Sequence, residues 1–496
     1  MKHFHLIFVF LIFCQSSFSQ FDKGIQGYWL QEGYGVYLEI SETTYKMYDV
    51  TQISCQPSSS SALNDWTGSL ETLFDLYKIE ETDEVSMILK YGITRYKFNK
   101  LKEPLALCEN PIFSSKDPKL NFNVLWHTFK ENYAYSALRG VDWDKIYRDH
   151  IHLITENTTE VELYGYIGEI LDAIQDEHIS LRVPKDISEA YLKIRELKKE
   201  ESEPSDNEKE VSDSNKEYDY TSLRSNALEN ILKLYNTNNF KRYHKDLLIW
   251  GKLKKEVGYI QINSMNGYSQ DVYVAESYNS NEYWDKHWEK VFDDIKKGKT
   301  LGQYLRGERK GVKVMMDSII TQLSDTPNLI IDLRFNPGGT DQVAMDILSY
   351  FTTNKTNIFT KKIWTGVENS FESKVYVESS DKLYQGKVVL LMGSQTGSSA
   401  EAMVLGSLGF KNIIRIGSNT MGIFSDVLQK KLPNGWSFGL SNEIYESSNN
   451  KNYEYVGITP DFLIPYSREW VTFHKSMVML NDKDPAIEKA FSIFNK

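Results

Sequence analysis

One stretch, residues 386–422, constrains the fold of this chain more than any other. It opens with an unbroken apolar run, Lys387-Val-Val-Leu-Leu-Met392, which is typical of a strand covered on both faces of a parallel sheet. Small and polar residues follow, and from Glu401 to Leu408 apolar residues recur at helical spacing before a second apolar run at 413–416. The stretch therefore predicts strand, sharp turn, helix and strand.

Ser398 lies at the predicted turn between strand and helix. The free amides of a helix and the positive end of its dipole converge at such a point, so an oxygen that becomes negatively charged is stabilised there. That is what an acyl-transfer nucleophile needs. The alternative is an ordinary helix cap made by Ser398 or Ser399, with Glu401 completing a capping box. Taken alone, the turn favours the cap.

Length and charge narrow the class of protein. A chain of 496 residues exceeds what one core usually covers, so two or three domains are expected. The net charge of -11 argues against nucleic acid as the main partner.

Residues 1–20 have a short basic start, an apolar part from Leu6 to Phe13 and a small, polar end. This pattern predicts a secretory signal peptide, because the apolar part is too short to span a bilayer. The protein is therefore expected to be exported, periplasmic or secreted, without stable membrane insertion. The bulky Phe13 before Cys14 argues against a lipid anchor.

Without that signal, two cysteines remain, Cys55 and Cys108. An exported chain meets oxidising conditions, so they form either one disulfide or two free thiols. Two cysteines are too few for a cysteine-rich metal site. His150 and His152 are two residues apart, which separates their side chains on a helix, so no metal and no cofactor are expected.

The first half of the chain divides by pattern. Short alternating aromatic runs predict a small antiparallel β domain over residues 21–115, and helical spacing predicts a helical subdomain over 116–183. The latter ends in Asp176-Glu-His178, a loop running into a strand. His178 thus lies where two elements meet, a place where sites often form.

The second half resumes an α/β pattern after a charged interval. Residues 184–250, dominated by the low-complexity tract from Glu196 to Tyr218, are interpreted as a flexible insertion. Repeated strand and helix patterns predict an α/β core over 251–470 with a largely parallel sheet, and a C-terminal helix over 471–496. Within this core, Gly338 and Gly339 follow a predicted strand, where they allow backbone amides to approach a ligand closely.

Five motifs in order resemble those of the tail-specific or C-terminal processing serine peptidases, and more closely their tricorn-like branch. They are Asp176-Glu-His178, Asp332-Leu-Arg-Phe-Asn-Pro-Gly-Gly339, Thr396-Gly-Ser-Ser-Ala-Glu401, Ile416-Gly-Ser-Asn-Thr-Met-Gly422 and Glu454-Tyr-Val-Gly-Ile-Thr-Pro-Asp461. The resemblance implies a crotonase-like α/β catalytic domain. The expected fold is therefore multidomain α+β, with that domain, a helical subdomain and a small antiparallel β N-terminal domain.

The resemblance also implies roles for residues that occupy the matching positions. Ser398 is expected to be the nucleophile, His178 the general base and Glu454 a member of the network that orients the base. The oxyanion hole is expected to consist of the backbone amides of Gly338, Gly339 and Ser399.

Two departures from the family pattern refine the mechanism. Ile423 stands where the processing branch carries a lysine base, which argues against a Ser-Lys dyad. Glu177 stands where the histidine branch often has a serine, so Asp176, Glu177 or Ser180 is expected to supply the inner part of the relay. A histidine base predicts that kcat/KM rises through an apparent pKa of roughly 6 to 7.5.

The sequence therefore predicts an exported serine peptidase that acts on a peptide or protein through a Ser-His acyl-enzyme mechanism. The alternative is a catalytically inactive peptide-binding or scaffold protein that keeps the peptidase fold.

Overall fold

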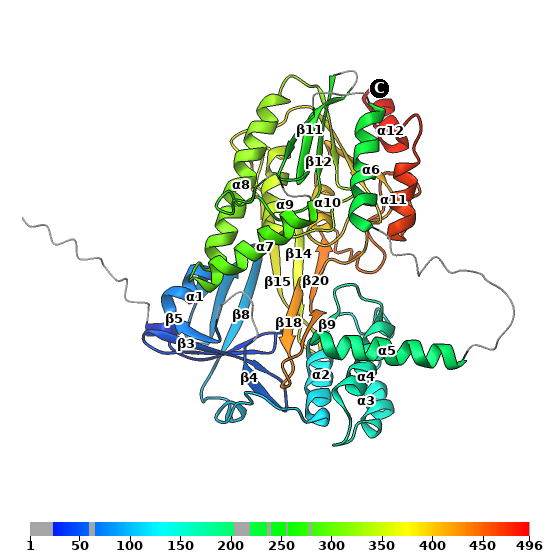
Figure 1. Ribbon diagram of the computed structural model, residues 1–496. Helices are drawn as coiled ribbons and strands as arrows, with labels where there is room; N and C mark the ends of the chain where they lie inside the picture. The colour runs from blue at the N-terminus through cyan, green and yellow to red at the C-terminus, as the bar shows by residue number, and fades with distance from the viewer. Residues whose placement is uncertain are drawn as a thin grey trace, which may run out of the picture.

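The computed structural model describes residues 23–58, 65–202, 219–235, 240–253, 256–275, 277 and 280–495. The expected signal peptide, residues 1–20, lies outside this part of the chain. As expected, the architecture is multidomain and mixes helices with sheets (Figure 1). No helix within the described ranges combines the length and the apolar character needed to cross a bilayer.

The N-terminal part is an antiparallel sheet in the order β4-β3-β2-β1-β8-β7-β6, with β5 paired to β3. Alternating side chains such as Trp29, Leu38 and Met47 form its core against the short helix α1. A disulfide joins Cys55 to Cys108, 53 residues apart, and closing a loop of that size stabilises the fold by about 4 kcal/mol in the chain-entropy model. The elements are β1 (Gly27–Gln31), β2 (Val36–Ile40), β3 (Thr44–Val50), β4 (Cys55–Pro57), β5 (Thr67–Ser69), α1 (Leu70–Leu76), β6 (Lys78–Thr82), β7 (Ser86–Tyr91) and β8 (Thr94–Leu101).

Three helices follow, α2 (Pro118–Asn132), α3 (Trp143–His150) and α4 (Glu160–Ile174). Each has a side-chain cap at its start, and α4 has a full capping box of Thr159 and Glu162. Gln175 ends α4 in the left-handed region at φ 57°, which turns the chain toward the short strand β9 (Ser180–Arg182).

The core of the second half is a seven-stranded sheet in the order β10-β11-β12-β13-β16-β17-β21. Its strands from β12 to β21 run parallel, whereas β10 and β11 are antiparallel. The strands are β10 (Lys241–Tyr243), β11 (Leu248–Leu253), β12 (Val257–Ile262), β13 (Asn328–Asp332), β16 (Lys387–Met392), β17 (Ile413–Gly417) and β21 (Phe462–Leu463).

Helices cover both faces of this sheet, as parallel strands require (Figure 1). One face packs against α8 (Leu301–Gln322), α9 (Asp341–Leu348) and α10 (Ser399–Ser407), and the other against α6 (Tyr220–Leu234), α11 (Trp470–Val478) and α12 (Pro485–Phe494). A further helix, α7 (Ser280–Lys296), precedes α8.

The prediction of a flexible insertion over 184–250 is wrong for most of the described residues in that interval. Residues 185–202 form the helix α5 (Lys185–Ser202). In α6, Leu228 and Ile231 are buried against the sheet, and β11 is a core strand. The charged residues before α6 dominate the pattern of this interval, so the sequence analysis did not recognise the apolar face of α6. The single C-terminal helix expected over 471–496 is likewise two helices, α11 and α12.

A buried ion pair fixes the C-terminus to the core. Asp484 caps α12 by accepting from the amide of Ala486 at 2.9 Å, and its carboxylate lies 2.7 Å from the guanidinium of Arg334. Both side chains are fully buried. Arg334 also pairs with Asp332 at 2.7 Å, so the end of β13 and the start of α12 share one charge cluster.

Two small sheets join the three parts of the chain. One has the order β15-β14-β20 and the other β18-β19-β9. Ile363 of β14 packs into the N-terminal core, and Phe438 of β19 packs among the helices α2 to α4. Their strands are β14 (Thr356–Trp364), β15 (Asn369–Val377), β18 (Val427–Lys431), β19 (Ser437–Ser441) and β20 (Glu443–Ser447).

Candidate active site

Ser398 forms the sharp turn between β16 and α10. Its backbone has φ 49° and ψ -124°, a conformation that is strained for any residue other than glycine. Its side chain makes no capping hydrogen bond to the helix and is partly exposed. The structure therefore shows the hydroxyl presented at the start of the helix rather than used as a cap.

Glu401 ties the next loop to this turn. Its buried carboxylate accepts hydrogen bonds from the amides of Gly422 at 2.7 Å and Ile423 at 2.8 Å, and burial raises its pKa to about 7. The position expected to hold a lysine in the processing branch is thus a buried isoleucine with a bonded amide. The first lysine after Ile423 in the sequence, Lys430, donates to Asp49 of the N-terminal sheet at 2.7 Å.

The glycine loop after β13 lies against Ser398. Gly338 has φ 109°, and a Cβ added to it would lie 2.7 Å from Cβ of Ser398 and 2.9 Å from the amide nitrogen of Ser399. Only glycine permits so close an approach of two backbones. The contact brings the loop amides and the first amide of α10 to one point.

The expected set of three amide donors needs one correction. The amide of Gly338 donates to the side-chain oxygen of Asn336 at 2.9 Å, so it is already occupied. The amides of Gly339 and Ser399 make no hydrogen bond within the described residues. The hydroxyl of Ser399 donates to the carbonyl of Gly339 at 2.8 Å, which fixes these two candidates side by side.

His178 lies in the loop between α4 and β9. Its backbone amide donates to Asp176 at 3.0 Å, and its buried Nδ1 has no hydrogen-bond partner among the described residues. Burial lowers the pKa of His178 below its ordinary value of 6.5, and Arg139 lowers it further against the opposing attraction of Asp176 and Asp426. The imidazole is therefore neutral at pH 7. Within the described residues no hydrogen bond joins it to Ser398.

A buried network supports the loop that carries His178. Asp176 accepts from the hydroxyl of Tyr133 at 2.9 Å and lies 3.8 Å from Nε of Arg139. Nη2 of Arg139 lies 3.3 Å from Oε1 of Glu454. Glu454 is therefore connected to the loop of His178 through Arg139 and Asp176.

The surroundings of Glu454 keep its carboxyl protonated near neutral pH. Burial raises its pKa to about 8, although the amide of Phe424 donates to Oε2, at 2.8 Å. Of the three relay candidates, Asp176 is the one inside the network. Glu177 is exposed, and Ser180 lies in β9 opposite Gly439 of β19.

Arg139 is the member of this network that sequence reasoning missed. It belongs to the segment Arg139-Gly-Val-Asp-Trp143, just after α2. Its side chain is only 3% exposed, which is unusual for arginine. A short arginine motif after an amphipathic helix was the available signal.

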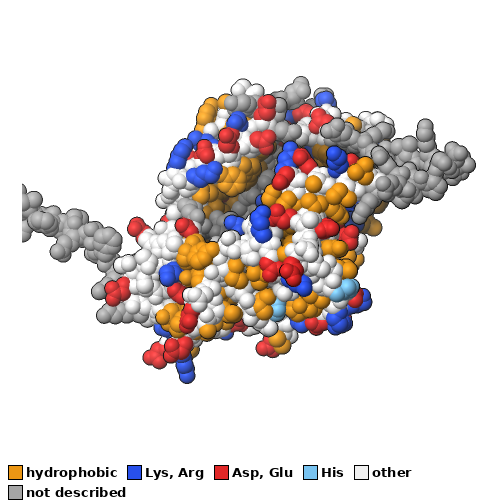
Figure 2. Space-filling model, turned by 60° about the horizontal axis from the view of Figure 1, so that its bottom comes forward, with side chains coloured by type: hydrophobic (Ala, Val, Ile, Leu, Met, Phe, Trp, Pro, Cys, Tyr) orange, Lys and Arg blue, Asp and Glu red, His pale blue; other side chains and the backbone are white. Residues whose placement is uncertain are grey.

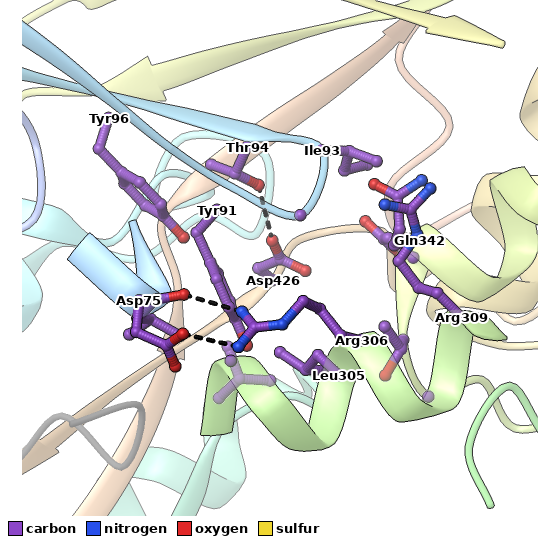
Figure 3. A pocket seen from close by; sticks show the side chains of 17 residues that line it. Asp75, Tyr91, Ile93, Thr94, Tyr96, Leu305, Arg306, Arg309, Gln342 and Asp426 are labelled. Carbon is purple, nitrogen blue, oxygen red and sulfur yellow. Dashed lines mark hydrogen bonds and ion pairs between the residues drawn. The ribbon is translucent and has the colours of Figure 1, made fainter. Parts of the chain in front are cut away.

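A cavity of about 410 Å³ extends from the glycine loop. Its walls come from the β7–β8 hairpin, including Tyr91 and Tyr96, and from Arg306 of α8 (Figure 3). Gly339 and Asp426 also line it. In Figure 3, Arg306 reaches across to Asp75 and Asp426 points to Thr94, at 2.6 Å and 3.3 Å respectively. The N-terminal sheet thus builds part of the cavity next to the candidate nucleophile.

No group of three or more His, Cys, Asp or Glu residues is arranged to hold a metal ion in the described part of the chain. Nδ1 of His150 contacts the carbonyl of Ile146, and Nδ1 of His152 contacts that of Arg148.

The space-filling view shows a hollow with hydrophobic side chains in its wall and lysine or arginine side chains beside it (Figure 2).

Two models of known protein families match this chain, one over the α/β core and one over the helical part. The model of peptidase family S41 matches residues 256–464, and that of the tricorn protease C1 domain matches residues 114–172. A search of curated proteins found no match.

Two solved structures share the fold. A candidate peptidase from Parabacteroides merdae is 19% identical with a TM-score of 0.53, over 77% of this chain and 98% of that one. Mature CPAF is 10% identical with a TM-score of 0.50, also over 77% of this chain and 98% of that one. The two family matches give no support to the alternative of an inactive binding protein.

Proposed function

Since this chain belongs to peptidase family S41 as a serine-type peptidase of the tail-specific, tricorn-like branch, we propose that it cleaves peptide bonds through an acyl-enzyme on Ser398. The observation that carries the proposal is how closely the glycine loop approaches Ser398. A Cβ added to Gly338 would lie 2.7 Å from Cβ of Ser398. This approach places a strained serine, a helix start and two unbonded amides at one point.

In this mechanism His178 removes the proton of Ser398 as the hydroxyl attacks the substrate carbonyl. The amides of Gly339 and Ser399 stabilise the oxyanion. His178 then protonates the leaving amine, and water releases the acyl group by the reverse sequence. The imidazole has to approach Ser398 when substrate fills the cavity, and such hydrogen bonds often tighten only in the complex.

The network of Asp176, Arg139 and Glu454 serves as a positioning device for the base. Asp176 holds the backbone of the His178 loop, while Arg139 disfavours the imidazolium electrostatically. A base that is neutral at physiological pH can accept the serine proton without prior deprotonation.

Export of the protein belongs to the same proposal. The pattern of residues 1–20 is that of a secretory signal, and the disulfide between Cys55 and Cys108 is the kind of bond that persists in oxidising compartments.

The proposal that the catalytic core is crotonase-like rests on the order of its motifs and on its parallel sheet.

Labelling with a fluorophosphonate probe tests the nucleophile. The wild-type protein should be labelled on Ser398, and Ser398→Ala should be unlabelled while its circular dichroism is unchanged. Ser407→Ala is the matched control, because this serine lies in the same helix α10 and its hydroxyl is bonded to the carbonyl of Val404. Labelling that persists in Ser398→Ala would overturn the assignment.

A further inference from the structure

A second cavity, of about 710 Å³, adjoins the one at the glycine loop. The two share Gly92, Ile93, Arg309 and Gln342 in their walls. These residues come from the β7–β8 hairpin, α8 and α9, and β15 closes the far side. A substrate chain in the first cavity therefore has a direct path into the second.

The charge of this second cavity is opposite to that of the whole protein. Seven Lys and Arg side chains line it, against two carboxylates, Asp346 and Glu378, whereas the chain as a whole carries a net charge of -11. Such a local excess concentrates anions by focusing the electrostatic field in a concave site.

Two of these cations are not neutralised by ion pairs. Arg309 pairs with Asp346 at 2.8 Å and Lys355 with Glu378 at 2.8 Å, which accounts for both lining carboxylates. The lining cations that pair with carboxylates outside the wall, Glu80, Glu81 and Asp381, are Lys90, Arg95 and Lys313. Lys310 of α8 and Lys374 of β15 are exposed and form no ion pair or hydrogen bond within the described residues. They are free to bind an anionic partner.

We propose that this cavity is an exosite for an acidic segment of the substrate, a few residues from the scissile bond. The proposal rests on the peptidase function argued above and adds a substrate class to it. An extended peptide advances about 3.3 Å per residue, so side chains only a few positions from the cleaved bond reach the second cavity. Aspartate or glutamate side chains there would meet Lys310 and Lys374.

Binding is measured first without turnover, so that it is independent of catalysis. Fluorescent peptides carrying a run of Asp and Glu, or of Asn and Gln in its place, are titrated into the Ser398→Ala protein at low and high salt. We expect the acidic peptide to bind about tenfold more tightly at low salt, and the preference to shrink at 0.5 M salt, because exposed charges are screened.

The double variant Lys310→Gln/Lys374→Gln should reduce that preference to about twofold, since each exposed pair contributes modestly. Lys119→Gln/Lys290→Gln is the control, because both of these lysines are exposed and line neither cavity; it should keep the full preference. Equal binding of the two peptides, or a preference untouched by the first variant, would overturn the exosite.

An amidated version of each peptide separates side-chain carboxylates from the terminal one. If amidation alone abolishes the preference, the cavity takes the chain end and the proposal as stated is wrong. Hydrolysis of the same peptides by the wild-type protein is then measured. Failure to cleave either peptide would count against the proposed function, whereas cleavage without an acidic preference would count only against the exosite.

Discussion

Arg139 and Glu454 lie 315 residues apart in the sequence and are joined by a buried hydrogen bond of 3.3 Å, from Nη2 of Arg139 to Oε1 of Glu454. Asp176 lies on the other side of the same guanidinium, at 3.8 Å. A single arginine therefore links the helical part of the chain, the loop of His178 and the loop after β20.

Replacing Arg139 should change how the base titrates. Arg139 lowers the pKa of His178, although burial is the larger cause, so Arg139→Gln should raise that pKa. Because the base works in its neutral form, the acid limb of kcat/KM should move to higher pH.

Profiles of kcat/KM against pH for wild type and variant measure this shift. Arg148→Gln, an exposed arginine on α3, is the control and should leave the limb in place. Reduced activity with an unshifted limb would show that Arg139 is structural and does not tune the base.

In the wild-type enzyme, kcat/KM should rise with pH through an apparent pKa below 6.5, the ordinary value for histidine. His178→Ala should remove the limb together with nearly all activity, about three orders of magnitude or more.

Lysine variants provide the comparison. Lys411→Ala and Lys431→Ala, both exposed, should keep the limb. Lys430 is unsuitable as a control because it is buried against Asp49. An active His178→Ala enzyme that loses activity on removal of a lysine would contradict the mechanism.

Gly338→Ala should lower kcat by about two orders of magnitude or more, because the new methyl group would displace the loop that carries the oxyanion amide. The added Cβ of Gly338→Ala would lie 2.7 Å from Cβ of Ser398. Gly298→Ala provides a matched control: its φ of 102° is close to the 109° of Gly338, but nothing lies within 4 Å of its added Cβ.

Both glycine variants carry the backbone strain, so both should lose about 1–3 kcal/mol of unfolding free energy. Only Gly338→Ala should lose turnover. Steady-state kinetics alongside urea denaturation separates the two effects, and equal losses of kcat in the two variants would refute the proposed geometry.

The stability of the fold should fall as pH rises from 6.5 to 8. Burial raises the pKa of Glu401 and Glu443 to about 7 and of Glu454 to about 8, so the folded state binds more protons than the unfolded state in this window. The protonated carboxyl groups stabilise the folded state at low pH, and this contribution is lost as the pH rises through their folded pKa values. His178 has a lowered pKa and acts in the opposite direction, but only below about 6.5.

Urea denaturation at half-unit steps of pH measures the slope. Glu454→Gln cannot ionise, so its slope should be shallower by about 1 kcal/mol per pH unit, whatever its absolute stability. A wild-type stability that is flat or rising across this window would contradict the burial argument.

The elements that sequence predicts best here are those whose side-chain pattern is local. The strand of residues 387–392 and the helix after Ser398 follow from one apolar run and one helical spacing. The positions of Asp176 and His178 beside a strand followed in the same way. Pairings such as Arg139 with Glu454 depend on how distant segments pack, and no local pattern encodes them.

Two site details were missed for a related reason. The sequence placed Gly338 among the oxyanion donors, but its amide is taken by a side chain only two residues away, Asn336. It treated Ser399 as a backbone donor alone, whereas its hydroxyl holds the carbonyl of Gly339. Hydrogen bonds within a loop depend on its exact dihedral angles, and residue types do not specify those.

The ion pair of Arg334 with Asp484 makes the geometry of the active site depend on a helix that lies outside it. Arg334 immediately precedes the loop that touches Ser398, so that loop is anchored through a carboxylate at the start of α12. Removing that carboxylate leaves Arg334 buried with one partner fewer. We expect Asp484→Asn to lower kcat through a displaced glycine loop, although Asp484 is neither the nucleophile nor its base.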